Sequence, residues 1–422
     1  MINFLEPNVV IVDDKREEIQ GIYDYYTTQG VGCKVFNPDL INGDNYPTKT
    51  YSDTSIIFLD LHYSEQFDPE ICTAWVRHIV KPRSFYILVM WTKDTSKAEQ
   101  VSTLLNTHKV IPFLTLIKSK TDYQAEQGYN FANLFDQLNA DLSSTPSLEE
   151  ILHWKKTVKY SSNEIIGNLT KNPNDIINKL KKIIISHGGS SIKESEDNIY
   201  KRSILFDALD TVLISNTKKN IDGDISELNS QNLYNLQDIT DGATDKELNS
   251  WFHFKLENEI SPNLISPGLI AINNHSFFKK LYSIKDDSKI EPLLKKQMDA
   301  NKEISDIVLV ISRPCDIAQK KYGKNLKLLS GLIIKNPQRK TNGKLDFVGT
   351  SMDSLKIYDH LYFDEDNDDV TLLFDFRYSF SVPSELFINK FTNVKIFSKE
   401  LLSEMQVEYS NYSSRLGITQ II

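Results

Sequence analysis

The chain has few cysteines and no long hydrophobic run, and these absences narrow its class. Among its 422 residues are three cysteines without paired spacing, Cys33, Cys72 and Cys315. This usage indicates a reducing compartment and argues against a disulfide framework or a thiolate metal site. No stretch approaches the roughly 18 apolar residues of a membrane span, and the first residues lack the basic segment of a signal peptide. We therefore expect a cytoplasmic protein with no membrane partner.

The sequence also lacks an excess of positive charge. It has 48 Lys and Arg residues against 57 Asp and Glu residues, a formal net charge of −9 at pH 7. Nucleic-acid binding needs a clustered basic face, so this balance argues against a nucleic-acid partner. The composition is otherwise that of a globular protein, with 40% hydrophobic and 25% charged residues. The length predicts two or three domains.

What the sequence does have is a series of short apolar segments that each end in a polar side chain. Four such segments are Val9–Val12 before Asp13 and Asp14, Ser55–Leu59 before Asp60, Phe85–Trp91 before Thr92, and Pro112–Ile117 before Lys118. Runs of this kind are typical of buried parallel strands. Because parallel strands end at one edge of their sheet, we expect these polar side chains to converge on one site.

Segments with helical spacing separate these strands. They are residues 15–29, 68–81, 96–108 and 127–142, and residues 32–37 form one further short strand. Asp68 followed by Pro69 is a helix start with an N-cap and proline at the first helical position. The pattern predicts an α/β fold for residues 1–144, with a doubly wound five-stranded parallel sheet covered by helices on both faces.

The order of the polar residues at the strand ends resembles the receiver domain of two-component response regulators. The resemblance covers about the first third of the chain and implies a flavodoxin-like fold. It implies that Asp60 is the phosphoacceptor, that Asp13, Asp14 and Asp60 hold Mg²⁺, and that Thr92 and Lys118 contact the phosphoryl group. It further implies a sensor histidine kinase as partner, and no enzymatic activity beyond this phosphotransfer.

The chemistry of these residues suits the implied roles. Three carboxylates at one edge repel one another unless a hard cation lies among them, and Mg²⁺ prefers oxygen ligands. Such an ion offsets charge on a transferring phosphoryl group, and a lysine supplies a fixed point charge. An acyl phosphate on Asp60 draws Thr92 inward. This movement shifts the surrounding surface from one of its two conformations to the other.

Several positions depart from the receiver pattern. Lys93 stands where the family has a small residue after the threonine, which crowds the site or changes the hydrolysis rate. Ser119 stands where the family has a proline after the lysine, and Lys120 is an alternative candidate for the lysine role. A competing interpretation is that each acid merely caps the end of its strand and faces solvent.

The rest of the chain divides into a helical segment, residues 145–215, and an α+β domain of unknown function, residues 216–422. Amphipathic helices are predicted over 147–160, 174–186 and 198–215, and a closing helix over 401–416. Strands are predicted over 306–312, 328–335, 355–363 and 370–382. The Cys315–Asp316 turn is open to three interpretations: a structural turn, a ligand or partner site, or a thiolate activated at a helix start.

Three functional hypotheses follow. The first is a phosphorelay receiver that takes a phosphoryl group onto Asp60 and is coupled to a C-terminal signalling, sequestering or interaction module, with a second signalling protein as a further partner. Receivers with large appendages are similar to those of bacterial antiphage two-component systems, an antiviral defence context. The second is a non-phosphorylated pseudo-receiver that acts as an interaction scaffold. The third is an enzyme centred on Cys315, for which no base is assigned.

Overall fold

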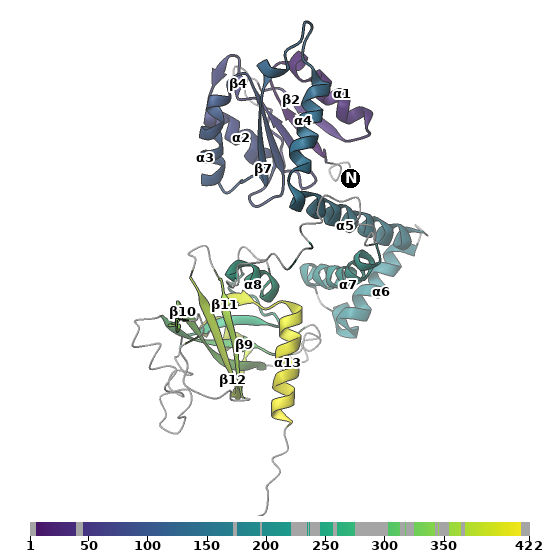
Figure 1. Ribbon diagram of the computed structural model, residues 1–422. Coiled ribbons are helices and arrows are strands. Elements are labelled where there is room, and N and C mark those ends of the chain that lie inside the picture. The colour runs from purple at the N-terminus through teal and green to yellow at the C-terminus, as the bar shows by residue number, and fades with distance from the viewer. Residues whose placement is uncertain are drawn as a thin grey trace, which may run out of the picture. The chain divides into compact units, whose positions relative to one another are not determined.

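The computed structural model divides the chain into two compact units (Figure 1). The N-terminal unit comprises Met1–Trp154 with Asp224–Asn235, and the second unit comprises Lys155–Gly223 and Leu236–Ile422. The structure describes residues 6–38, 45–171, 175–194, 196–220, 234, 236, 245–255, 260–274, 303–312, 317, 325–341, 345, 354–363 and 368–414. The three-part division with boundaries after residues 144 and 215 stays a prediction.

A five-stranded sheet forms the centre of the N-terminal unit. Its strands are β1 (Val9–Val12), β2 (Cys33–Phe36), β3 (Ile56–Leu59), β6 (Ile87–Thr92) and β7 (Leu114–Ser119). Their order is β2-β1-β3-β6-β7, and every neighbouring pair is parallel. The predicted α/β class and the all-parallel five-stranded sheet are confirmed.

Helices cover both faces of this sheet (Figure 1). They are α1 (Gln20–Thr28), α2 (Pro69–Ile79), α3 (Ala98–Thr107) and α4 (Phe131–Ser143). Alternate strand residues point to opposite faces, so Val10 packs with the α2 and α3 side chains while Ile11 packs with those of α1 and α4. The Asp68 side chain accepts hydrogen bonds from the backbone at Glu70 and Ile71 and caps α2, as predicted.

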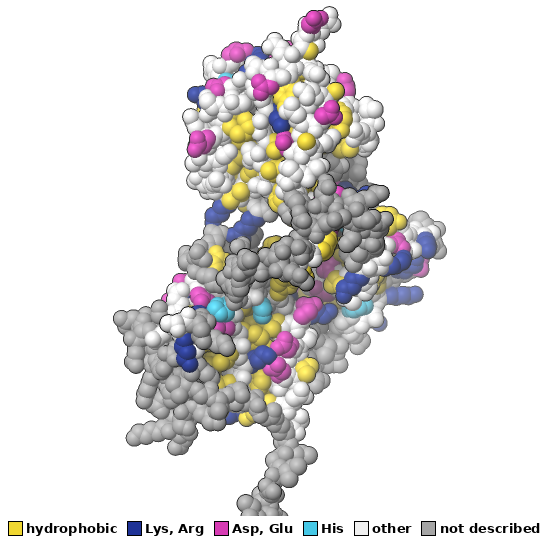
Figure 2. All heavy atoms as spheres, in the orientation of Figure 1, with side chains coloured by type: hydrophobic (Ala, Val, Ile, Leu, Met, Phe, Trp, Pro, Cys, Tyr) yellow, Lys and Arg dark blue, Asp and Glu magenta, His cyan; other side chains and the backbone are white. Residues whose placement is uncertain are grey.

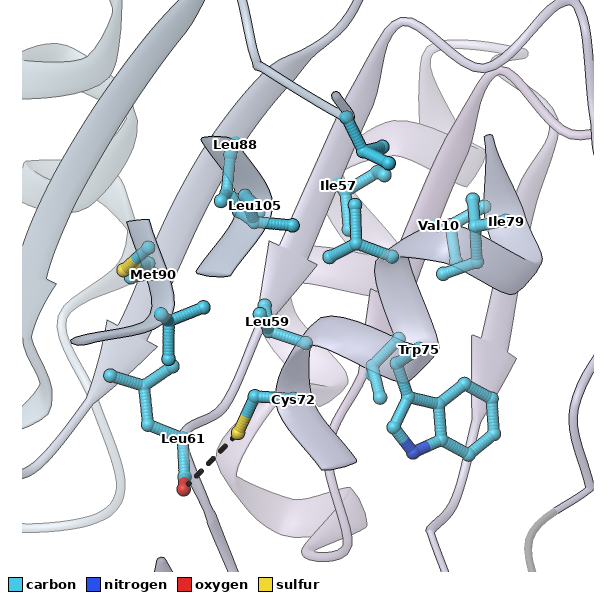
Figure 3. Packing of buried hydrophobic residues seen from close by; sticks show 14 of the residues in the cluster. Val10, Ile57, Leu59, Leu61, Cys72, Trp75, Ile79, Leu88, Met90 and Leu105 are labelled. Atoms are coloured by element: carbon cyan, nitrogen blue, oxygen red, sulfur yellow. Dashed lines mark hydrogen bonds between the residues drawn. The ribbon is translucent and has the colours of Figure 1, made fainter. Parts of the chain in front are cut away.

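The face of the sheet under α2 and α3 is closed by large apolar side chains (Figure 3). Trp75 of α2 is fully buried, and so are Ile57, Leu59 and Leu88 of the strands. The Cys72 thiol also lies in this layer, with its sulfur 3.5 Å from the Leu61 carbonyl oxygen. This apolar layer includes Leu59, the last residue of β3, and Leu61, which flank Asp60 in the sequence.

Three further helices follow: α5 (Pro146–Thr170), α6 (Ile176–Gly188) and α7 (Asn198–Lys219). The first extends ten residues beyond the predicted end at residue 160, and the division between the units falls within it. Large hydrophobic side chains stay exposed on these helices, namely Ile151, Trp154, Tyr160, Ile166, Ile177, Ile199, Phe206, Val212 and Ile214. Figure 2 shows hydrophobic side chains reaching the surface between charged ones on the face in view. Of the described helices, none combines the length and apolar composition needed to cross a bilayer.

The second unit also contains a six-stranded antiparallel sheet with the order β11-β12-β10-β9-β8-β13. Its strands are β8 (Leu269–Asn273), β9 (Ile304–Val310), β10 (Asn325–Lys335), β11 (Leu355–Leu361), β12 (Val370–Pro383) and β13 (Phe391–Ile396). Helix α13 (Lys399–Ser413) packs on one face and α12 (Ser384–Lys390) on the other, and α8 (Lys246–His253) precedes the sheet. Strands β8 and β13 were not predicted from the sequence, because their short segments lack a clear alternation of apolar and polar residues. The Cys315–Asp316 turn lies outside the described residues.

Candidate functional site at the carboxyl edge of the parallel sheet

The register of the parallel strands brings Asp13 and Asp60 together. Val12 of β1 pairs with Leu59 of β3, so the residue after each strand lies at the same level. The backbone N–H of Asp60 donates to the Val12 carbonyl oxygen at 2.9 Å, which continues the pairing to the carboxylates themselves. Both side chains are almost completely buried. Two acids 47 positions apart in sequence thus become neighbours at the carboxyl edge of the sheet, as predicted.

The Lys120 ammonium lies at the centre of the site and contacts three carboxylates. Its Nζ is 2.8 Å from Asp13 Oδ2, 2.9 Å from Asp60 Oδ2 and 2.6 Å from Glu18 Oε2. The side chain is 1% exposed, so these ion pairs lie out of contact with water. One ammonium against three carboxylates leaves the cluster with an excess of negative charge when all groups are ionised.

The expected placement of Lys118 is wrong. Strand β7 continues through Ser119, so Lys118 is a strand residue that pairs with Trp91 of β6. Its Nζ lies 2.6 Å from Asp141 Oδ2 on helix α4. The first side chain beyond the strand end is that of Lys120, which was the alternative candidate and takes the position expected of Lys118.

Glu18 is a site residue that the sequence analysis missed. It lies in the 3-10 turn Arg16–Glu18, and its Oε1 is 2.7 Å from Lys93 Nζ while its other oxygen contacts Lys120. The Trp91 indole N–H donates to the Glu18 carbonyl oxygen at 3.2 Å and holds this turn against the sheet. In the sequence, Glu18 lies in a charged segment whose composition predicts exposure to solvent. The available signal was its closeness along the chain to Asp13.

The remaining predicted residues lie at the same edge with different partners. Asp14 Oδ2 accepts a hydrogen bond from the Ser64 backbone at 2.6 Å, and its Oδ1 is buried without a hydrogen-bond partner among the described residues. Thr92 is fully buried, and its Oγ1 lies 3.3 Å from His62 Nδ1. Asp60 Oδ1 accepts from the Leu61 backbone at 2.7 Å, which orients the carboxylate with Oδ2 toward Lys120.

Burial and charge shift the acid–base properties of the cluster. Burial raises the pKa of Asp13 to about 7; the Lys120 ammonium opposes this rise and Asp60 adds to it. Burial also raises the pKa of Asp60, again against the opposing effect of Lys120. Burial alone would raise the pKa of Glu18, but hydrogen bonds from Lys120 and Lys93 outweigh it and lower that pKa. Glu18 is therefore the acid of the cluster that is held most firmly in its charged form.

The cluster also has the ligand chemistry of a site for a hard cation. One oxygen each from Asp13, Glu18 and Asp60 lie within 4.8 Å of one another. Asp14 does not belong to that group, although its partnerless buried Oδ1 is the kind of atom that a cation satisfies. An all-carboxylate set suits Mg²⁺. The residues present therefore fit the ion, with the Lys120 ammonium as its competitor for Asp13 and Asp60.

A second cluster of charged side chains lies in the antiparallel sheet of the second unit. The Arg339 guanidinium binds Asp359 through two nitrogens, at 2.7 and 2.8 Å, and Asp369 at 2.8 Å. His360 Nε2 lies 3.3 Å from the same guanidinium, and Thr371 donates to Asp359 at 2.6 Å. The arginine occupies the space between the acids, so this network joins the ends of β11 and β12 to the segment after β10.

No protein-family model matches the chain, and a search of curated proteins found no match either. The geometry of the site at the parallel sheet is therefore the basis for inferring a function. The site contains the buried Asp60 carboxylate and the buried Lys120 ammonium bound to it. The acids Asp13 and Asp14 and the Thr92 hydroxyl lie at the same edge of the sheet.

Proposed function

We propose that the N-terminal unit is a divergent phosphoacceptor receiver with flavodoxin-like topology, in which Asp60 accepts a phosphoryl group from the phosphohistidine of a partner kinase. The observation that carries the proposal is the buried Lys120 ammonium, bound at once to Asp13 at 2.8 Å and Asp60 at 2.9 Å. The strand order β2-β1-β3-β6-β7 supports this topology, because sheets with the order 2-1-3-4-5 bind ligands at the switch point between the first and third strands.

Each side chain has a chemical role in this transfer. A carboxylate oxygen of Asp60 attacks phosphorus, a P–O bond forms, and the P–N bond to the kinase imidazole breaks. The imidazole nitrogen then takes a proton from solvent. Lys120 stabilises negative charge on the phosphoryl oxygens, and Thr92 at the end of β6 offers its hydroxyl beside the same edge. Because Asp60 is buried, the acyl phosphate is shielded from bulk water.

Mg²⁺ is the cofactor that we propose for this site. Asp13, Asp14 and Asp60 would hold it, and the buried partnerless oxygen of Asp14 supports this assignment. The bound ion supplies positive charge that offsets the charge of a phosphoryl group. The second unit, with its antiparallel sheet, would serve as the signalling, sequestering or interaction module.

Phosphorylation by a small donor tests this function directly. The full chain is incubated with acetyl phosphate and Mg²⁺, and phosphoprotein is measured by intact-mass spectrometry. We expect one acid-stable, base-labile phosphoryl group on the wild type, none on Asp60→Asn and strongly reduced labelling of Lys120→Met. Lys118→Met is the matched control, because Lys118 pairs with Asp141 instead, and it should be labelled like the wild type. An unlabelled wild type contradicts the proposal.

A second candidate function, a pseudo-receiver that binds a partner without phosphorylation, is favoured by the occupancy of the site. The Lys120 ammonium already neutralises part of the charge of Asp13 and Asp60, so these buried acids have a protein cation as their partner. Under this hypothesis Mg²⁺ does not stabilise the protein and Asp60 stays unlabelled. Binding of a partner would then be unaffected by Asp60→Asn.

A further inference from the structure

The Glu18 carboxylate bridges two ammonium groups at the mouth of the site. Its Oε2 lies 2.6 Å from Lys120 Nζ and its Oε1 lies 2.7 Å from Lys93 Nζ. The Lys120 and Glu18 side chains are 1% and 8% exposed, whereas Lys93 is 49% exposed. The exposed fraction therefore increases from Lys120 through Glu18 to Lys93.

The Lys120 ammonium has no donor left for a phosphoryl oxygen in this arrangement. An ammonium has three N–H donors, and Asp13, Glu18 and Asp60 each accept one at 2.6–2.9 Å. Phosphorylation of Asp60 Oδ2 frees the one N–H that this oxygen accepts, so a second phosphoryl oxygen can bind Lys120 only by displacing Asp13 or Glu18. Asp13 is fixed at the end of β1, while Glu18 lies in a loop turn and has a second cation to hold it. Of these two acceptors, Glu18 is therefore the easier one to displace.

We propose that Glu18, positioned by Lys93, competes with the phosphoryl group for Lys120 and thereby sets the lifetime of phosphorylated Asp60. The inference rests on the phosphotransfer function proposed above. In the decay, a water oxygen attacks phosphorus and the P–O bond to Asp60 breaks. The Asp60 carboxylate and inorganic phosphate are formed, and a proton passes to solvent. A nearby Glu18 carboxylate repels the phosphoryl group and withholds its cation, so it favours this decay.

The pairing with Lys93 moderates the competition. The Lys93 ammonium draws charge and one oxygen of Glu18 toward the surface and keeps that carboxylate from binding Lys120 with both oxygens. Without Lys93, Glu18 holds Lys120 more tightly and carries an uncompensated charge. Lys93 is therefore a positioning residue that acts through Glu18, and its effect should vanish when Glu18 is neutral.

A double-mutant cycle on the full chain tests this inference. Wild type, Glu18→Gln, Lys93→Met and the double variant are phosphorylated with acetyl phosphate and Mg²⁺ and freed of donor by desalting. The decay of phosphoprotein is then followed by mass spectrometry. We expect Glu18→Gln to lengthen the half-life about 5- to 10-fold and Lys93→Met to shorten it about 2- to 5-fold. The double variant should decay like Glu18→Gln, and Lys118→Met like the wild type.

The outcomes separate this inference from the function on which it rests. Labelled proteins with equal half-lives, or a Glu18→Gln variant that decays faster than the wild type, overturn the competition alone. A double variant that decays faster than Glu18→Gln shows that Lys93 contacts the phosphoryl group directly and overturns its assigned role. A wild type that takes no phosphoryl group overturns both proposals. Lys93 is half exposed, so Lys93→Met is expected to fold. If Glu18→Gln does not fold, a Lys93→Met half-life that is not shorter than that of the wild type still overturns the inference.

Discussion

Lys120 Nζ lies 2.9 Å from Asp60 Oδ2, and both side chains are buried at the carboxyl edge of the parallel sheet. The two residues are 60 positions apart and come from different strand ends, so their contact exists only in the folded unit. Each group is costly to bury alone, and the ion pair makes their joint burial tolerable. The contribution of this ion pair to stability and its contribution to ligand binding can be measured separately.

Removal of the Lys120 ammonium should strongly destabilise the N-terminal unit. Lys120→Met leaves the carboxylates of Asp13, Glu18 and Asp60 buried without their shared cation, which costs about 3 to 5 kcal/mol. Hydrogen exchange of the β1 and β3 amides at pH 7.5 reports this unit alone. Lys118→Met, which breaks a partly exposed pair, should cost less than about 1 kcal/mol. Equal losses for the two variants would mean that the buried cluster has no special role in stability.

Mg²⁺ should stabilise the N-terminal unit through the acids at the sheet edge. At a concentration ten times the dissociation constant, the free energy of opening of the β1 amides should rise by about 1.4 kcal/mol, and chelation should reverse the effect. Asp14→Asn should abolish this rise without destabilising the protein in the absence of the ion, because the asparagine oxygen can still accept from the Ser64 backbone and Asp14 Oδ1 has no protein partner among the described residues. An equal rise in the variant would place the ion elsewhere.

The loop before β3 should show acid sensitivity that depends on Glu6. Burial would raise the pKa of Glu6, but hydrogen bonds from Ser52 and Asp53 and the Lys49 ammonium lower it from 4.5 to about 2. Since the folded pKa is the lower one, the stabilisation is complete above pH 4.5 and disappears as the pH falls through 2. Glu6→Gln should cost about 1 to 2 kcal/mol at pH 7 and little near pH 2, as measured by exchange of the β1 amides. A cost that does not change with pH would exclude the carboxylate charge as its source.

The Arg339 network should hold the end of the antiparallel sheet together. Arg339→Met leaves Asp359 and Asp369 without their shared cation and should cost about 1 to 3 kcal/mol, visible as faster exchange at the start of β12. Arg339→Lys should recover only part of this loss, because an ammonium does not reproduce the two-nitrogen contact with Asp359. Full rescue by lysine would show that charge alone matters at this position.

The positions of Lys118 and Lys120 show which features of the site can be predicted from the local sequence and which cannot. The apolar run that forms β7 is visible in the sequence, but its last residue is decided by pairing with β6, where Thr92 aligns with Ser119. Two extra strand residues, Lys118 and Ser119, placed Lys118 against α4 and let Lys120 turn into the acidic cluster. Glu18 was missed for a related reason, since its burial depends on contacts with Trp91 and Lys120 from distant segments.

The sequence by itself determined the parallel sheet and the position of Asp13 and Asp60 at its carboxyl edge. The residues of an apolar strand are buried on both faces of a parallel sheet that helices cover. The polar residue that follows such a strand lies where the strand ends. The tertiary structure alone decided which lysine meets those acids and that a third acid, Glu18, joins them. Ion pairing between buried groups depends on distances of a few ångströms, and only strand register and the packing of Trp91 set those distances.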